Sequence, residues 1–167
     1  MPVLSITTSE ATIVANFGGI YEHSAWVAEE TASQLIGVDD IELVADIMAD
    51  CVDNASSERQ LKLICAHPDL AGKTQIEGEL TEDSSDEQSS AGLDHCSAKE
   101  YEKFQTLNDE YHEKFSFPFV MAVRDSSRAE ILEAFENRLG NDHATEFETA
   151  IGEIHKIARM RLQAMVN

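Results

Sequence analysis

The segment SAKEYEKFQTLNDEYHEKF, residues 97–115, gives the clearest indication of the fold class. It begins with Ser97, and Glu100 follows three residues later, which is the pattern of a helix-capping box. Aromatic side chains then recur at helical spacing along one stripe, at Tyr101, Phe104, Tyr111 and Phe115. This pattern predicts a long amphipathic helix that buries the stripe in a core.

Similar helical patterns lie on both sides of this segment. The spacing of apolar residues predicts helices over residues 24–37, 39–52, 56–66 and 127–140, and from about 142 towards 165. The expected N-caps are Ser24, Asp39 and Ser127, and the expected C-caps are Gly37 and Gly140. In the helix over residues 56–66, we expect Leu61, Ile64 and Cys65 to share one face.

Two segments lack a helical period. Residues 67–83, HPDLAGKTQIEGELTED, contain a proline and two glycines and are predicted to form a long loop. Residues 116–123, SFPFVMAV, are predicted to form an extended, buried connector between two helices. Residues 1–167 are therefore expected to form one all-α domain, a bundle of about seven to eight helices.

The charge balance limits the class of partner. The chain has 12 Lys and Arg residues against 32 Asp and Glu residues, a net charge of -20. Such a surface repels nucleic acid and anionic membranes, so we expect neither as a partner. Three widely spaced cysteines, with no secretory pattern at the start of the sequence and no long apolar run, favour a cytoplasmic protein.

His67 is the first candidate for chemistry. It stands where a predicted helix ends, so its cation could simply interact favourably with the helix dipole. Pro68 fixes the backbone φ angle directly after it, and a long loop follows. An imidazole held in this way is also suited to donate or accept a proton near neutral pH.

The segment 84–88 has two readings. Ser84 as N-cap with Glu87 three residues later matches a capping box, and Gln88 could serve Ser85 in the same way. The start of a helix also presents free backbone N–H groups that bind anions or carbonyl oxygens. The sequence leaves both roles open.

Arg161 lies on the apolar stripe of the last predicted helix, between Ala158 and Met165. A guanidinium on an apolar face costs several kcal/mol unless it is paired. Its partner is either a buried carboxylate or an anionic ligand, and the sequence favours neither. If the partner is a ligand, Arg161→Leu should weaken substrate binding without loss of stability.

A metal site has weak support. The close clusters of His and Cys are Cys65 with His67 and His95 with Cys96, and neither has the ligand spacing of a known metal motif. Asp109 and His112 lie on one edge of the helix over residues 97–115, and we expect that edge to be solvated. We predict no bound metal.

Five segments in order resemble the 2-oxo-4-hydroxy-4-carboxy-5-ureidoimidazoline (OHCU) decarboxylases. They are HPDLAGK (67–73), SSDEQSSAGLD (84–94), YHEKFSFPFVMAV (111–123), ILEAFENRLGND (131–142) and EIHKIARMRL (153–162). The resemblance covers about residues 10–165. It implies an all-α fold, a homodimer, and decarboxylation of an anionic ureidoimidazoline to (S)-allantoin, the last step from urate, without metal or organic cofactor.

The resemblance also implies roles for individual residues. His67 would be the catalytic acid, with Glu87 near the reacting centre and Arg161 on the polar edge of the substrate. The remaining substrate-binding residues would be Pro68, Ser84, Ser85, Asp86, Gln88, Phe119, Val120, Met121, Ala122 and Val123. The family usually has glycine where this chain has Ser116, so a positive φ angle there would carry a cost. A non-catalytic ureide-binding protein of the same fold is the alternative.

Overall fold

Helices make up the regular structure of both parts of the chain that the computed structural model describes, residues 9–72 and 80–167. No strand occurs in these residues, which confirms the all-α class. They group into two compact units. The first contains residues up to Ala66 together with those from Ile154 onward, and the second runs from His67 to Glu153. No helix in these ranges is long and apolar enough to cross a bilayer.

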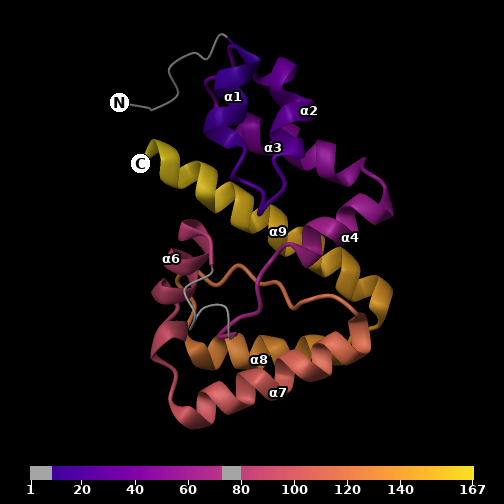
Figure 1. Ribbon diagram of the computed structural model, residues 1–167, viewed down its shortest axis with the longest axis vertical. Helices are drawn as coiled ribbons and strands as arrows, with labels where there is room; N and C mark the ends of the chain where they lie inside the picture. The colour runs from indigo at the N-terminus through magenta and orange to yellow at the C-terminus, as the bar shows by residue number, and fades with distance from the viewer. Residues whose placement is uncertain (1–8, 73–79) are drawn as a thin grey trace. The chain divides into compact units, whose positions relative to one another are not determined.

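The first unit contains α1 (Glu10–Phe17), α2 (Trp26–Leu35), α3 (Ile41–Asp53), α4 (Ser57–Cys65) and the C-terminal half of α9 (His143–Val166). Helix α2 packs against both α1 and α3 (Figure 1). The apolar residues of these helices recur at helical spacing, so their buried members form one core: Ile13, Phe17, Val27, Leu35, Val44, Met48 and Val52.

Two helix boundaries in this unit differ from the prediction. Helix α2 has Ala25 as its N-cap, because the Ser24 hydroxyl donates to the Glu22 carbonyl instead of capping the helix. Helix α3 starts one residue later than expected, since the carboxylate of Asp40 accepts the hydrogen bond from the Glu42 N–H. Gly37, the expected C-cap of α2, lies one residue beyond its cap with a φ angle of 77°.

The face of α4 that carries Leu61, Ile64 and Cys65 is only partly buried. Leu63 and Ile64 are fully buried, whereas Leu61 is 39% exposed and Cys65 is also exposed. With 3.6 residues per turn, the apolar residues of this short helix cover a wide arc. Spacing alone therefore did not determine which part of that arc meets the core.

The second unit contains α6 (Glu82–Ser90), the short 3-10 helix η1 (Leu93–His95), α7 (Ala98–Phe115), α8 (Arg128–Leu139) and the first part of α9. Helices α7 and α8 run side by side (Figure 1), and α6 contacts η1. The capping box predicted at Ser97 is present at the start of α7, and the expected N-cap Ser127 forms a second capping box at the start of α8. The core of this unit is aromatic, with Phe104, Tyr111, Phe115, Phe117, Phe119 and Phe135 buried.

The predicted connector between α7 and α8 is confirmed. It lacks regular secondary structure, and Phe117, Phe119, Val120 and Val123 are buried. Its first residue, Ser116, is the C-cap of α7 and has a φ angle of 62°, in the left-handed region where glycine is favoured.

We expect Ser116→Gly to raise the free energy of unfolding by roughly 0.5–1 kcal/mol, because glycine adopts this φ angle without a steric penalty. Chemical denaturation would measure the change. Ser116→Ala is the matched control, since alanine removes the hydroxyl and keeps the penalty. Equal stabilisation by both replacements would show that the backbone angle is not the cause.

Candidate functional site

The corner at His67 follows directly after α4, whose C-cap is Ala66. His67 is buried, with 7% of its surface exposed, and Pro68 is half-buried. Burial restricts the imidazole, and the proline fixes the backbone φ angle directly after it. Such restriction suits a group that must deliver a proton in one direction.

The three residues after Pro68, Asp69 to Ala71, are held by side chains from two helices. Gln88 of α6 accepts from the Ala71 N–H at 3.1 Å and donates to the Asp69 carbonyl at 3.3 Å. From α7, Asn108 donates to the Leu70 carbonyl at 3.0 Å, Gln105 to the Ala71 carbonyl at 2.7 Å, and His112 pairs with the Asp69 carboxylate at 2.8 Å. This loop is therefore fixed to α6 and α7. The residues of the predicted long loop from 73 to 79 lie outside the described residues.

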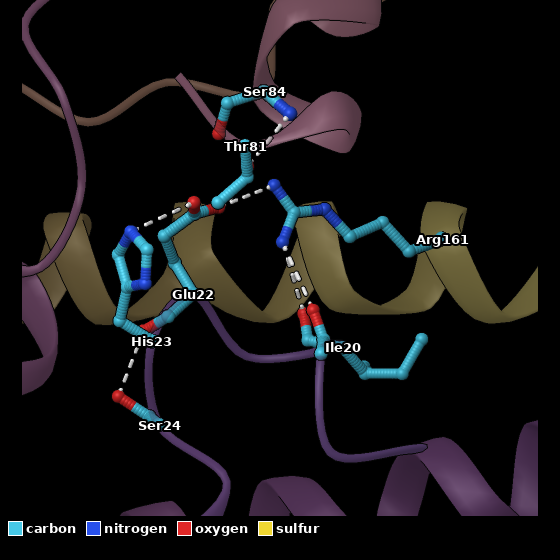
Figure 2. A network of polar contacts seen from close by, with 8 residues as sticks. Ile20, Glu22, His23, Ser24, Thr81, Ser84 and Arg161 are labelled. Carbon is cyan, nitrogen blue, oxygen red and sulfur yellow. Dashed lines mark hydrogen bonds and ion pairs between the residues drawn. The ribbon is translucent and has the colours of Figure 1, made fainter. Parts of the chain in front are cut away.

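Helix α6 begins earlier than the sequence suggested. Its N-cap is Thr81, whose hydroxyl accepts from the Ser84 N–H at 3.2 Å (Figure 2). The prediction that Ser84 caps this helix and offers free N–H groups to an anion is therefore wrong, because Thr81 provides the cap three residues earlier. Ser84, Glu87 and Gln88 are buried and share one face of α6. Ser85 and Asp86 are exposed.

Gln88 uses its side chain within the protein. Its amide oxygen and nitrogen both bond to the loop at Asp69 and Ala71, and only 2% of its surface is exposed. The reading of Gln88 as a capping partner for Ser85 is wrong, since both residues lie inside α6. Gln88 instead joins α6 to the loop that follows the His67–Pro68 corner.

The connector between α7 and α8 contains the five residues 119–123, whose backbone groups are expected to bind the substrate. Phe119, Val120 and Val123 are buried, while Met121 and Ala122 are half-buried. The Phe119 ring stacks on Phe135 with the ring centroids 3.9 Å apart. The connector is therefore anchored by its aromatic residues, and Met121 and Ala122 lie nearer the surface.

Arg161 belongs to the first unit and is buried. Its guanidinium donates to the Glu22 carboxylate at 2.7 Å and to the carbonyls of Gly19 and Ile20 at 3.4 and 3.3 Å (Figure 2). The side chains of Arg161 and Glu22 are 4% and 1% exposed, so this is a buried ion pair. A buried carboxylate is thus one partner of Arg161, the first of the two sequence-based readings.

Glu22 was missed by the sequence analysis. It stands among Ile20, Tyr21 and Ser24, all buried, in a stretch outside the predicted helices. The available signal was a single acidic residue beside apolar neighbours, with no period to place it. Of the predicted site residues, Arg161 belongs to the first unit, and the others belong to the second.

The expected residues therefore provide an acid–base group, a carboxylate and backbone groups in one unit, and a paired guanidinium in the other. Among the residues that the structure describes, no group of three His, Cys, Asp or Glu side chains could hold a metal ion. His112 contacts Asp69 rather than forming a motif with Asp109.

Comparison with known proteins gives consistent matches. The family model of OHCU decarboxylase matches residues 7–163. The 2-oxo-4-hydroxy-4-carboxy-5-ureidoimidazoline decarboxylase of Haloferax volcanii is 46% identical over 153 residues, covering 90% of this chain and 87% of that protein. The protein of the same name from Halalkalicoccus jeotgali is 45% identical over 148 residues, covering 89% and 81%.

A solved structure agrees with these matches. The crystal structure of (S)-allantoin synthase superposes with a TM-score of 0.74 at 34% sequence identity. The match covers 96% of this chain and 52% of that one, so this chain spans about half the length of that protein.

Proposed function

The chain belongs to the OHCU decarboxylase family, and from this membership we infer that it is a decarboxylase of urate degradation that converts 2-oxo-4-hydroxy-4-carboxy-5-ureidoimidazoline to allantoin. The observation that carries the inference is the match of the family model to residues 7–163. In finer detail, we propose a carboxy-lyase that forms the (S) enantiomer without a cofactor, with the whole chain, residues 1–167, acting as one functional domain.

We propose that His67 is the proton donor. When the bond between the ring carbon and its carboxylate breaks, CO₂ leaves and the electron pair stays on the carbon, delocalised into the ring. A proton from the imidazole then forms the new C–H bond, and solvent reprotonates the imidazole. The burial of His67 and the bonds that hold the loop after Pro68 support delivery to one face of the ring.

Glu87 and Ser84 are proposed to contact the substrate from α6. Both are buried on the face of α6 that also carries Gln88, whose amide bonds to the loop after His67. The carboxylate of Glu87 would lie near the reacting centre, where it orients the imidazole or disfavours the departing carboxylate. Gln88 would act by holding the loop, and the exposed Ser85 and Asp86 would offer their side-chain oxygens to the substrate.

For Arg161, the pair with Glu22 supports a particular kind of contact. The carboxylate of Glu22 already balances the charge of the guanidinium. We therefore propose that Arg161 donates hydrogen bonds to a neutral polar edge of the substrate, such as the ureido carbonyl. An unbalanced cation beside the carboxylate of the substrate would stabilise the substrate before it reacts. The loss of CO₂ would then be slower.

We further propose that the protein is a homodimer and acts in the cytoplasm. The family resemblance supports the first proposal. The second is supported by the three cysteines, all of which are free thiols, as a reducing compartment requires. Light scattering coupled to size-exclusion chromatography would test the dimer, and a monomer at working concentration would refute it.

The reaction can be tested by circular dichroism of urate treated with urate oxidase and hydroxyisourate hydrolase, with and without this protein. We expect rapid formation of a stable signal from (S)-allantoin. Without catalysis, the intermediate decays slowly to a racemate with no lasting signal. Decay at the blank rate in the presence of the protein would contradict the proposal and favour a ureide-binding protein, which calorimetry with allantoin would then detect.

A further inference from the structure

The second unit contains a buried ion pair that lies outside the proposed catalytic residues. Arg138, near the end of α8, and Glu146, in the first turn of α9, pair with a distance of 2.6 Å between Nε and Oε1. The carboxylate of Glu146 has no exposed surface and also accepts from the Tyr111 hydroxyl at 2.5 Å and from Asn141 at 3.0 Å. Burial and this bond to Glu146 raise the pKa of Tyr111, so the hydroxyl stays protonated and donates.

The guanidinium of Arg138 also holds the connector between α7 and α8. Its Nη1 atom donates to the Val120 carbonyl at 2.6 Å. Its central carbon lies 4.3 Å from the centre of the Phe119 ring, which stacks on Phe135, also of α8. One side chain therefore holds both a backbone carbonyl and an aromatic ring of the proposed substrate-binding segment.

Planarity of the peptide group carries this restraint to the next residue. The Val120 carbonyl and the Met121 N–H belong to the same trans peptide, in which they point in opposite directions. Because Arg138 donates a hydrogen bond to the Val120 carbonyl, the Met121 N–H must point away from the Arg138–Glu146 pair. The Ala122 N–H donates to the Glu153 carboxylate at 3.4 Å, so the Met121 carbonyl likewise points away from Glu153.

The energetics favour a geometric role for this pair. Apolar residues of similar volume are often as stabilising as a buried ion pair, because the pair must recover the cost of desolvating two charges. A charged fork that bonds a carboxylate and a backbone carbonyl together, by contrast, determines direction closely. Direction is what a backbone segment needs if its N–H and C=O groups are to meet a ligand.

We propose that Arg138, held by Glu146, is a positioning residue for the decarboxylation, and that it aims the two peptide groups flanking Met121 at the imidazoline ring. This inference rests on the proposed function. The Met121 N–H would donate to the ring 2-oxo group, and the Met121 carbonyl would accept from a ring N–H. Arg138 itself does not touch the substrate in this arrangement.

The first test is steady-state kinetics of Arg138→Lys, in which lysine keeps the charge and loses the fork. We expect kcat/KM to fall roughly 10- to 100-fold, with KM raised, because a displacement of about 1 Å at the ring is sufficient for such a loss. Arg128→Lys is the matched control. Arg128 also bonds a carboxylate through Nε, that of Glu100 at 2.9 Å, and a backbone carbonyl through Nη1, that of Gly92 at 3.0 Å.

Arg128→Lys is expected to lose less stability than Arg138→Lys, because the Arg128 and Glu100 side chains are 34% and 30% exposed, and only Arg138→Lys should lose activity. Equal kcat/KM for the two would overturn the proposal. Failure of the proposed function is distinguishable, because the wild-type protein itself would then show no turnover.

The second test reads the backbone directly and does not depend on turnover. The chain has five methionines, so selective 15N labelling of methionine gives a simple amide spectrum. When allantoin is added to the wild type or to Arg128→Lys, we expect the Met121 amide resonance to move downfield. In Arg138→Lys, we expect the same resonance to move less. A Met121 resonance that does not respond to bound allantoin in the wild type would overturn the assignment.

Discussion

Replacing His67 with alanine is expected to lower kcat by about 10²- to 10⁴-fold, the usual contribution of a positioned general acid. The reason is that protonation of the carbanion would then depend on water, which has restricted access to a group as buried as this one. Stopped-flow circular dichroism on freshly generated intermediate would measure the loss.

The fold should survive this replacement, with a loss of unfolding free energy within about 2 kcal/mol. His95→Ala is the matched control, because the side chain of His95 is 80% exposed and lies outside the proposed site. Near wild-type turnover by His67→Ala would remove His67 from the mechanism. Total loss of activity together with loss of helical signal would show instead that the residue supports the fold.

Replacing Arg161 with leucine is expected to destabilise the protein by about 3–5 kcal/mol, because it leaves the carboxylate of Glu22 buried without its partner. At about 2–4 °C per kcal/mol for a chain of this length, the unfolding temperature should fall by roughly 6–20 °C. If a ligand were the only partner of Arg161, this variant would keep its stability, and the buried pair with Glu22 reverses that expectation. Scanning calorimetry would measure the shift.

Arg159→Leu is the control on the same helix. Arg159 pairs with Glu42 and Asp46, but its side chain is 38% exposed, so solvent screens these contacts and the cost should stay below about 1 kcal/mol. The double variant Glu22→Leu/Arg161→Leu should recover much of the stability, since both charges are gone. It should not recover substrate affinity, and recovery of both would restrict Arg161 to a structural role.

Most of the helices could be predicted because their signals are local. A capping box such as Ser97 with Glu100 places a side-chain acceptor next to free N–H groups within one turn, so no distant residue is needed. Where local signals compete, the tertiary structure selected one of them. Thr81 rather than Ser84 caps α6, and Asp40 rather than Asp39 caps α3.

The candidate site shows the same division. His67 was recognisable because proline follows it at the end of a helix. Glu146 was not recognised, although it lies four residues before Ala150 and eight before Ile154, on the buried side of α9. Glu146 lies in the first turn of a helix, where exposed acidic residues are common. Its position in the sequence therefore did not indicate that it is buried.

The sequence by itself determined the all-α class, the ends of α7 and α8, the buried connector and the family, because each depends on spacing within a short segment or on the order of motifs. Only the tertiary structure decided which groups are paired. Glu22 meets Arg161 across 139 positions of the chain, and Gln88 meets Ala71 across 17. A side-chain contact depends on where the packed helices bring two residues, and the spacing within one segment does not contain that information.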